Sequence, residues 1–462
     1  MTVSGNDKYC YLGIGSNLGD RRANIEKALQ LISAAQDIHV KKVSSLGEYP
    51  ALVKAETDFR ANVLPFLNIV AQIEFNGNCL TLLAILQKIE KEIGKAKSED
   101  KAFNPRCIDI DILLFKNESI QTESLVVPHY DLLNRNFFLD LLCQLDSSVV
   151  VAGNEIIHWK RKLKNQTYSC MEIFNANNNS FSADGLFDEG GKINAENLKR
   201  RIQESYNERA AIIDIGAIST APKNETIIYT AEEEIEIITE TLNLVNSEFA
   251  LSPYSYTLPK ISIDTFRYEV MKNLIDGGYK FDILNDQSGL DDPLKLELLK
   301  DADCDILIMH SSGLPVKADS YHKCADLDIF LDEIKTYFKD KISQCIKYGI
   351  PRSRIIIDPG IGFGKSGVQS VYLLKNVDFF SDLNVRFAIG HSRKRFLKAI
   401  FQDWHESENL IKMNELDGGE SLLKDFESSL ISCCLGGEAV EYLRVHNLKF
   451  AKAAKWCFLS LK

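Results

Sequence analysis

The segment Ile355-Ile-Ile-Asp358 is an apolar run that ends abruptly in a charged residue, and this pattern occurs eight times from about residue 166 onward. The residues that end the eight runs are Asn175, Asp214, Asp264-Thr265, Asn285-Asp286, His310, Asp358, His391-Ser-Arg-Lys394 and Arg444-Val-His446. Buried parallel strands appear as nearly continuous apolar runs, because helices cover both faces of their sheet. Eight such runs separated by helical stretches predict an α/β eight-stranded barrel of the TIM type. The active site of such a barrel lies where the strands end, so a polar group at every end indicates an enzyme.

Length and composition favour two domains and small-molecule substrates. At 462 residues the chain is too long for one hydrophobic core. Its 54 basic and 65 acidic side chains leave a net charge of −11, which argues against a nucleic-acid partner, since that needs a concentrated basic surface. No apolar run approaches the ~20 residues that cross a bilayer, so we expect no membrane partner. Eleven scattered cysteines fit a reducing compartment. We expect a cytoplasmic protein, with a mitochondrial location as the alternative, although no transit peptide is visible.

The first 155 residues predict a second fold. Strand-like runs occur at Tyr9–Ile14, His39–Ser45, Asn68–Phe75 and Ile108–Phe115, and helical stretches follow Asp20 and cover Leu82–Ile93. This β-α-β-β-α-β order fits an α+β ferredoxin-like domain. The charged stretch Lys160-Arg-Lys-Leu-Lys164 precedes the first barrel strand. We therefore predict domains at residues 1–155 and 169–462, with a linker at residues 156–168.

Asp109-Ile110-Asp111 is the main chemical feature of the N-terminal domain. Residues two apart on a strand point to the same face, so both carboxylates project together. Two adjacent negative charges need a cation between them, and Mg²⁺ suits hard oxygen ligands. Nearby in the sequence are Lys95, Lys97, Lys101, Arg106, His129, Tyr130 and Arg135. Paired acids beside cations suit phosphoryl-type transfer from a nucleotide, while a solvated strand edge beside a charged loop is the alternative.

Three motifs in this domain resemble hydroxymethyldihydropterin pyrophosphokinase. They are Leu12-Gly-Ile-Gly-Ser-Asn-Leu-Gly-Asp20, Asn104-Pro-Arg-Cys-Ile-Asp-Ile-Asp-Ile-Leu113 and Val127-Pro-His-Tyr-Asp-Leu-Leu-Asn-Arg135, in the family's order. The resemblance implies that Asp109 and Asp111 hold two Mg²⁺ ions on the phosphates of the cosubstrate ATP. It implies nucleotide contacts by Gln87, Glu90, Arg106, His129, Tyr130 and Arg135. It implies pterin contacts by Tyr49, Pro50, Asn68 and Phe137. It also implies catalytic roles for Arg106 and Lys97. Lysines stand at 95 and 97 where the family often has arginines, and they lack the bidentate fork, so we expect slower turnover or altered loop ordering.

The barrel resembles dihydropteroate synthase over roughly residues 168–462. The motifs are Ile212-Ile-Asp-Ile-Gly216, Ser219-Thr220, Ile261-Ser-Ile-Asp-Thr265, Asn285-Asp286, Met309-His310, Asp358-Pro-Gly-Ile-Gly-Phe-Gly-Lys365, Ser392-Arg-Lys394 and Arg444-Val-His446. The resemblance implies that pterin pyrophosphate condenses with p-aminobenzoate and expels pyrophosphate. It implies substrate contacts by Asp264, Asn285, Met309, Asp358, Gly362, Lys394, Ser219 and Thr220, pyrophosphate contacts by Arg444 and His446, a magnesium ligand in Asn175, and catalytic roles for Lys394 and Arg444. Preorganised cations suit a leaving pyrophosphate, and the family's barrels usually pair, so we expect a homodimer.

Two barrel loops depart from the family's pattern. The family's Asn-Val-Thr-Pro-Asp-Ser-Phe-Ser is here Asn175-Ala-Asn-Asn-Asn-Ser-Phe-Ser182, and its Glu-Ser-Thr-Arg-Pro-Gly is Ile218-Ser-Thr-Ala-Pro-Lys223. The loop Asp and Arg are thus Asn179, at the end of Asn177–Asn179, and Ala221, with Lys223 as the nearest cation. We predict a bifunctional folate-biosynthesis transferase that makes pterin pyrophosphate and then 7,8-dihydropteroate. One alternative is an active kinase with a non-catalytic pterin-binding barrel. Another is a methyltransferase, which the anion-binding residues argue against.

Overall fold

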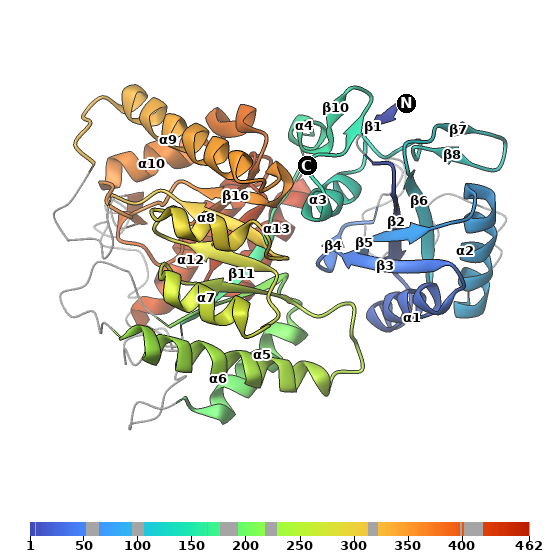
Figure 1. Ribbon diagram of the computed structural model, residues 1–462, viewed down its shortest axis with the longest axis horizontal. Coiled ribbons are helices and arrows are strands. Elements are labelled where there is room, and N and C mark those ends of the chain that lie inside the picture. The colour runs from blue at the N-terminus through green and yellow to red at the C-terminus, as the bar shows by residue number, and fades with distance from the viewer. Residues whose placement is uncertain are drawn as a thin grey trace. The chain divides into compact units, whose positions relative to one another are not determined.

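The computed structural model describes residues 1–4, 6–51, 64–94, 106–163, 165–175, 193–217, 229–312, 322–397, 400–401 and 419–461. The chain forms two compact units (Figure 1). The first unit consists of Met1–Thr167 with two further segments, Ser252–Leu258 and Leu459–Lys462, and the second of Tyr168–Leu251 and Pro259–Phe458. In these described ranges, no helix combines the length and the apolar character that a membrane span requires.

The first unit is built on an antiparallel sheet with the strand order β3-β5-β2-β6, in which β4 also pairs with β5. The elements are β2 (Tyr9–Ser16), α1 (Arg21–Ala34), β3 (Ile38–Val43), β4 (Gly47–Tyr49), β5 (Phe66–Phe75), α2 (Cys79–Ile93) and β6 (Asp109–Phe115). Apolar side chains of α1 and α2, such as Leu29 and Leu86, are buried in one cluster with alternate strand residues such as Leu12 and Ile69. Both helices therefore cover the same face of the sheet, and the predicted ferredoxin-like fold is confirmed.

Helix ends in this unit follow from local sequence signals. The Asp20 carboxylate accepts the backbone N–H of Ala23 at 3.0 Å and so caps the first turn of α1. Gly94 adopts the left-handed conformation (φ 113°) at the end of α2, which glycine tolerates without a Cβ clash. These two signals set the boundaries that the sequence predicted.

The opposite face of the sheet carries α3 (Asn136–Leu145). Gly13 of β2 makes this contact possible, because a Cβ at that position would lie 2.7 Å from Cε1 of Phe138. Residues 156–162 lie in the predicted linker and form the helix α4 (Ile156–Lys162). Lys160 on α4 is buried because α4 packs on α3. Its ammonium group lies 3.7 Å from Asp140 of α3. The remaining strands are β1 (Val3–Ser4), β7 (Ile120–Gln121), β8 (Val126–Val127), β9 (Val150–Val151) and β10 (Asn154–Glu155).

The segment Ser252–Leu258 belongs to the first unit although barrel residues precede and follow it in the chain. The buried carboxylate of Glu26 on α1 accepts the backbone N–H groups of Ser255, Tyr256 and Thr257 at 2.5 to 3.2 Å. A carboxylate with three such donors is well satisfied without a cation. The segment is thus held by main-chain hydrogen bonds that its side-chain sequence does not reveal.

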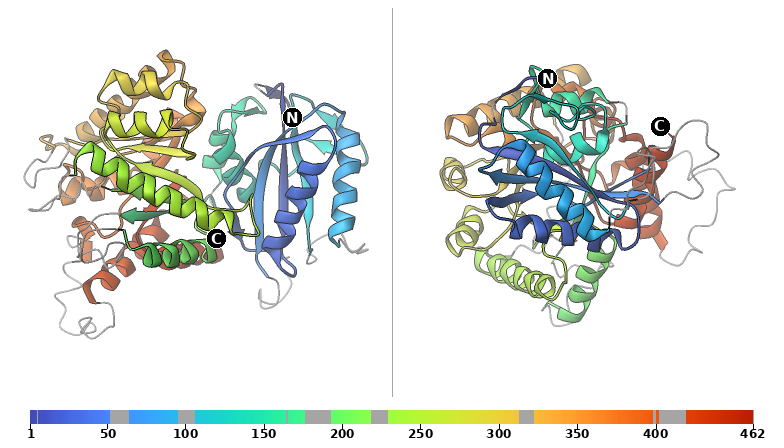
Figure 2. Two further views of the ribbon diagram at one scale, coloured as in Figure 1. Left: turned by 60° about the horizontal axis from the view of Figure 1, so that its bottom comes forward. Right: turned by 90° about the vertical axis from the view of Figure 1, so that its right-hand side faces the viewer.

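The second unit is a closed barrel of eight parallel strands in sequence order, as predicted (Figures 1 and 2). The strands are β11 (Ser169–Asn175), β12 (Ile212–Gly216), β13 (Lys260–Asp264), β14 (Ile283–Asp286), β15 (Asp305–Met309), β16 (Ile355–Asp358), β17 (Arg386–Gly390) and β18 (Tyr442–Val445). The helices are α5 (Ala195–Asn207), α6 (Ala231–Ala250), α7 (Tyr268–Asp276), α8 (Pro293–Leu299), α9 (Leu327–Lys347), α10 (Gly367–Lys375), α12 (Gly419–Cys434) and α13 (Leu448–Leu461), with short 3₁₀ turns at Arg352–Arg354 and Val377–Leu383. The main core lies between the strands and the surrounding helices.

The interior of the barrel positions the candidate site. A layer of small and apolar side chains fills its middle, namely Met171, Ala211, Ile212, Ile283, Leu307, Ile356, Ala388 and Tyr442. Because alternate residues of a strand face the same side, the residue two places beyond each of these strand residues also faces the interior, nearer the carboxyl end. On β12, β14, β16 and β18 that residue is Asp214, Asn285, Asp358 and Arg444.

Candidate active sites

The strand β6 presents Asp109 and Asp111 on one face, while Ile110 between them is buried in the core. The two carboxylate side chains are 23% and 31% exposed. Arg106 lies 2.6 Å from Asp109, and Nε2 of His129 lies 3.9 Å from Asp111. Partly exposed carboxylates on one face are the oxygen donors that a divalent cation prefers.

His129 is arranged to be neutral at physiological pH. Burial lowers the pKa of its imidazole to about 4, and the charge of Arg135 acts in the same direction. Its Nδ1 accepts the backbone N–H of Asp131 at 3.2 Å. Arg135 pairs with Asp131 at 2.9 Å, and the neighbouring Tyr130 is 60% exposed. His129 can therefore serve a ligand through hydrogen bonding rather than through charge.

The two residues predicted on α2 differ in their surroundings. Gln87 is exposed. Glu90 is buried, and its carboxylate accepts the backbone N–H of Ile110 at 2.9 Å. Glu90 thus holds β6 in place, a contact that the sequence did not predict, and its predicted role at the nucleotide stays a prediction.

The predicted pterin residues of the first unit lie on β4, β5 and α3. The rings of Tyr49 and Phe137 have centroids 5.8 Å apart, and Pro50 follows Tyr49 directly. Asn68 is buried, and its amide nitrogen has no hydrogen-bond partner among the residues that the structure describes. A side chain on Gly15 would lie 2.7 Å from the Asn68 oxygen, so glycine leaves room for this amide. Leaving a buried donor unpaired is costly, so this amide is available to an acceptor on a ligand.

In the barrel, Arg444 lies between the buried carboxylate of Asp214 and the partly buried carboxylate of Asp264. Its Nε and Nη2 donate to Asp214 at 2.9 and 2.6 Å, and Nη2 donates to Asp264 at 2.6 Å. The Gln287 amide also donates to both oxygens of Asp264 at 2.6 Å. Burial raises the pKa of Asp264 to about 7, against the opposing charge of Arg444. Asn285, the neighbour of Asp264 in the sheet register, completes this end of the interior.

Two lysines lie near Asp358, Lys365 on the glycine-rich loop after β16 and Lys394 beyond the end of β17. Lys394 donates to the carbonyl of Ile361 and lies 4.3 Å from the ring of Phe363, and burial lowers its pKa to about 7. Gly362 has φ 75°, and a Cβ there would lie 3.3 Å from Cδ of Lys394, so glycine keeps this approach open. Lys365 donates to three backbone carbonyls at 3.0 to 3.1 Å, and burial lowers its pKa to about 7 as well.

Met309 closes the apolar side of the same region. It is buried, pairs with Asp358 in the sheet register and packs on Phe363. The structure therefore brings Asp264, Asn285, Met309, Asp358, Gly362, Lys394 and Arg444 to the carboxyl end of the barrel strands. A flat ligand with a mixed donor and acceptor edge suits this set of carboxylate, amide, ammonium and thioether groups.

The predicted pyrophosphate residues lie at the ends of β11 and β18, and Ser392 beyond β17 lies beside one of them. Ser392 contacts the backbone N–H and the Nδ1 of His446 at 3.3 and 3.1 Å. Burial and then the charges of Arg393, Arg201, Arg444 and Lys394 lower the pKa of His446. Arg393 and Arg201 are themselves paired with Asp425 and Glu172. The Arg444 guanidinium itself is engaged by Asp214 and Asp264, and the pyrophosphate roles of Arg444, His446 and Asn175 stay predictions.

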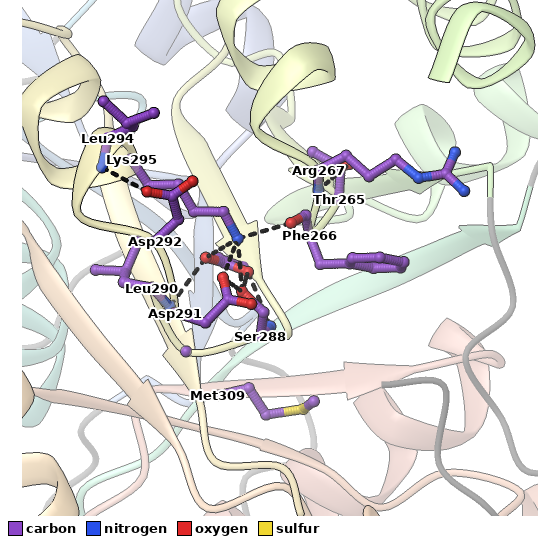
Figure 3. Close-up of polar contacts among 12 residues, drawn as sticks. Thr265, Phe266, Arg267, Ser288, Leu290, Asp291, Asp292, Leu294, Lys295 and Met309 are labelled. Atoms are coloured by element: carbon purple, nitrogen blue, oxygen red, sulfur yellow. Dashed lines mark hydrogen bonds and ion pairs between the residues drawn. The ribbon is translucent and has the colours of Figure 1, made fainter. Parts of the chain in front are cut away.

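A buried lysine that the sequence did not single out joins two strand ends (Figure 3). The Nζ of Lys295 on α8 donates to the Phe266 carbonyl at 2.7 Å, to Ser288 at 2.7 Å and to Asp291 at 2.6 Å, and lies 3.3 Å from Asp286. Phe266 follows β13, whereas Asp286 ends β14. Lys295 thus connects the backbone just beyond Asp264 to the residue next to Asn285. A lysine three residues beyond an N-capping Asp292 carries no sequence signal of burial.

Some predicted residues lie outside the described ranges. These are Lys97 with Lys95 and Lys101 of the first unit, and Ser219, Thr220, Asn177–Asn179, Ile218, Ala221 and Lys223 of the barrel. Their predicted roles stay predictions.

Comparison with protein-family models finds two matches. Residues 171–446 match the family described as pterin binding enzyme. Residues 11–147 match 7,8-dihydro-6-hydroxymethylpterin-pyrophosphokinase. The second match lies within the first structural unit, and the first match covers most of the second unit together with Ser252–Leu258.

Curated relatives carry both regions in one chain. The folate synthesis bifunctional protein of Chlamydia muridarum is 30% identical over 471 residues, with 96% of this chain and 97% of that protein covered. The folic acid synthesis protein of Schizosaccharomyces pombe is 32% identical over 416 residues, with 84% of this chain covered. The aligned region spans only 52% of that fungal protein.

Solved structures share the fold. A Plasmodium falciparum HPPK-DHPS structure with pteroate has a TM-score of 0.54 and 21% identity, covering 99% of this chain and 96% of that chain. A dihydropteroate synthase of Anaplasma phagocytophilum with bound 6-hydroxymethylpterin-monophosphate has a TM-score of 0.50 and 27% identity, covering 64% of this chain and 100% of that chain.

Proposed function

The chain belongs to the pterin-binding enzyme family and also carries a 7,8-dihydro-6-hydroxymethylpterin-pyrophosphokinase domain, and we propose that the two described sites perform consecutive steps of folate biosynthesis. The first unit transfers a pyrophosphoryl group from ATP to the hydroxymethyl oxygen of 6-hydroxymethyl-7,8-dihydropterin. The barrel condenses that product with p-aminobenzoate to give 7,8-dihydropteroate and pyrophosphate. We keep the predicted boundaries, residues 1–155 and 169–462, as part of this proposal.

The kinase step rests on the paired carboxylates of β6. Two partly exposed aspartates on one face fit Mg²⁺ ions, which would neutralise phosphate charge and align the transferred group. In the described residues no cluster of three or more His, Cys, Asp or Glu side chains forms a metal site, so phosphate and water oxygens would complete the coordination. Arg106 contributes fixed positive charge beside Asp109, and neutral His129 offers a hydrogen bond.

Pterin recognition in the first unit rests on the Tyr49 and Phe137 rings and on the unpaired Asn68 amide. The aromatic pair supplies apolar area for a flat heterocycle, while the amide N–H donors meet an acceptor on its edge. The hydroxymethyl group of the pterin would then be directed toward the carboxylate pair on β6.

The observation that carries the synthase assignment is the convergence of Asp264, Asn285, Asp358 and Lys394 at one end of the barrel interior. In the proposed reaction the pterin carbon–oxygen bond to pyrophosphate breaks, the amine nitrogen of p-aminobenzoate bonds to that carbon, and the amine loses a proton. Lys394 donates a hydrogen bond to the pterin edge, and Arg444 and His446 bind the leaving pyrophosphate. Asn175 would hold the magnesium of that pyrophosphate.

A coupled assay tests the proposal. Purified protein with hydroxymethyldihydropterin, ATP, Mg²⁺ and p-aminobenzoate should form dihydropteroate, and omission of any one of these should stop it. Pterin pyrophosphate should replace the pterin and ATP together. If the kinase product accumulates and no dihydropteroate forms with any order of addition, the barrel is a non-catalytic pterin-binding module and the second step is refuted.

The homodimer through the barrel helices and the cytoplasmic location belong to the proposal as well. Two plant relatives, of Pisum sativum and Arabidopsis thaliana, are named mitochondrial. Sedimentation of the full chain and localisation of a tagged chain test the two statements.

A further inference from the structure

Asp214 contacts two residues of the proposed pterin site and touches no substrate in that proposal. It is the third residue of β12, and its side chain is fully buried. Its Oδ2 accepts from Nε and Nη2 of Arg444 at 2.9 and 2.6 Å. Both of its oxygens lie 3.4 to 3.5 Å from the amide nitrogen of Asn285.

The carboxylate determines which way the Asn285 amide points. An ionised carboxylate only accepts hydrogen bonds, so an amide beside it turns its NH₂ toward the carboxylate and its oxygen away. In the structure the Asn285 oxygen is buried and has no hydrogen-bond partner among the described residues. Leaving a buried acceptor without a donor is costly, so this oxygen suits a donor on a ligand.

The unpaired oxygen lies in the region that the proposed function gives to the pterin. Asn285 follows Ile283 by two residues, and Ile283 belongs to the interior layer of the barrel. Asn285 is the sheet neighbour of Asp264, which Arg444 and Gln287 already occupy as donors. The Asn285 oxygen is therefore an available acceptor at this end of the interior.

We propose that Asp214 is a positioning residue that fixes the Asn285 amide with its oxygen toward the pterin, so that the site selects a ring N–H donor there. The inference rests on the proposed function and assigns the donor and acceptor pattern of its ligand. A ring that offers an acceptor at this position is rejected, because two acceptors would face each other in a buried space.

The test exchanges the two side chains. Asp214→Asn should weaken binding of 6-hydroxymethylpterin to the full chain about tenfold, because either amide can then rotate and Arg444 loses one carboxylate. Asn285→Asp should weaken it at least as much, because two acids then lie side by side. The double variant D214N/N285D restores one donor and one acceptor with their places exchanged, and it should recover to within about threefold of the parent chain.

Asp305→Asn is the matched control. Asp305 is a barrel aspartate that pairs with an arginine, Arg386 at 2.8 Å, but it lies at the start of β15, away from the strand ends. The Asp305→Asn variant should have a lower melting temperature, and its pterin affinity should differ from that of the parent chain by no more than about twofold. Calorimetric titration with 6-hydroxymethylpterin measures all of these variants.

Parent-like affinity in Asp214→Asn, or an exchanged double variant no tighter than the weaker single variant, overturns the inference. If Asp214→Asn does not fold, Asn285→Leu tests the same acceptor, and unchanged pterin affinity there overturns it too. Failure of the proposed function looks different, since the parent chain itself would then neither bind the pterin nor form dihydropteroate.

Discussion

Replacing Lys295 with methionine should destabilise the barrel strongly. The Lys295 side chain is 3% exposed, its ammonium group has four oxygen neighbours, and Asp286 beside it is fully buried. Methionine preserves much of the side-chain volume but leaves that carboxylate without a cation. Breaking a buried ion pair in this way costs about 3–5 kcal/mol. Asp286 would retain donors from Ser288 and Leu290 at 2.6 to 3.0 Å, so we expect about 3 kcal/mol, a decrease in melting temperature of roughly 6–12 °C.

The loss should also depend on pH in a defined direction. Burial raises the pKa of Asp286, and the charge of Lys295 opposes that rise. Without the lysine, the pKa of Asp286 in the folded state moves further above the unfolded value of about 3.9. An acid with a raised folded-state pKa costs stability as the pH rises above the unfolded pKa, because the folded state must bind a proton or hold an unpaired charge. The defect should therefore be largest near pH 7–8 and shrink as the pH falls toward about 4.

Thermal unfolding by circular dichroism between pH 4.5 and 8 measures this effect. Adding Asp286→Asn to Lys295→Met should recover part of the loss at pH 7, since it removes the unpaired charge. Lys272→Met is the control, because Lys272 forms an exposed pair with Asp276 on the neighbouring α7 and should matter little. A small loss, or one of equal size at every pH, would refute the reasoning.

Three further outcomes are expected. Asp109→Ala or Asp111→Ala should abolish pyrophosphokinase turnover, measured by AMP release, because the proposed metal ligands are lost, and a substantial residual rate would contradict the assignment. Lys394→Ala should cripple only dihydropteroate formation from pterin pyrophosphate, whereas a slower kinase would contradict the two-site model. Since burial keeps the pKa of His129 near 4, kcat/KM of the kinase should show no His129 titration between pH 6 and 8. An inflection there that disappears in His129→Asn would count against the neutral imidazole.

The barrel was predictable because each strand is an apolar run with a polar end. Three isoleucines before Asp358 form a strand that is buried on both faces, and the same rule placed Asp214 and Asn285 at the ends of their strands. Lys295 was not predictable, since its acceptors include a backbone carbonyl and side chains of a loop, and no local pattern distinguishes it from a solvated helix lysine. The burial of Lys160 was not predictable for the same reason, because its partner Asp140 lies twenty positions earlier in the chain. The spacing of apolar residues shows which face of a helix or strand is buried. It does not show which polar side chain is buried by a segment that lies far away in the sequence.

In the N-terminal unit, too, some site residues were predictable from the sequence and others were not. Asp109 and Asp111 share a face because of the strand period, which the sequence reveals directly. The burial of Glu90 was not predictable, because a glutamate on a helix is ordinarily solvated. Its carboxylate accepts the Ile110 N–H only because β6 packs beside α2.

The excursion of Ser252–Leu258 into the first unit bears on how this polypeptide can be dissected. A protein that stops at Thr167 would lack the main-chain donors that surround Glu26, and a carboxylate made for three N–H groups would be left to water. No single cut keeps all segments of the first unit together, so separate expression of the halves should give a kinase less stable than the one in the intact chain. The two units are thus connected by more than one linker, since Ser252–Leu258 lies between two barrel segments in the chain and completes the fold of the first unit.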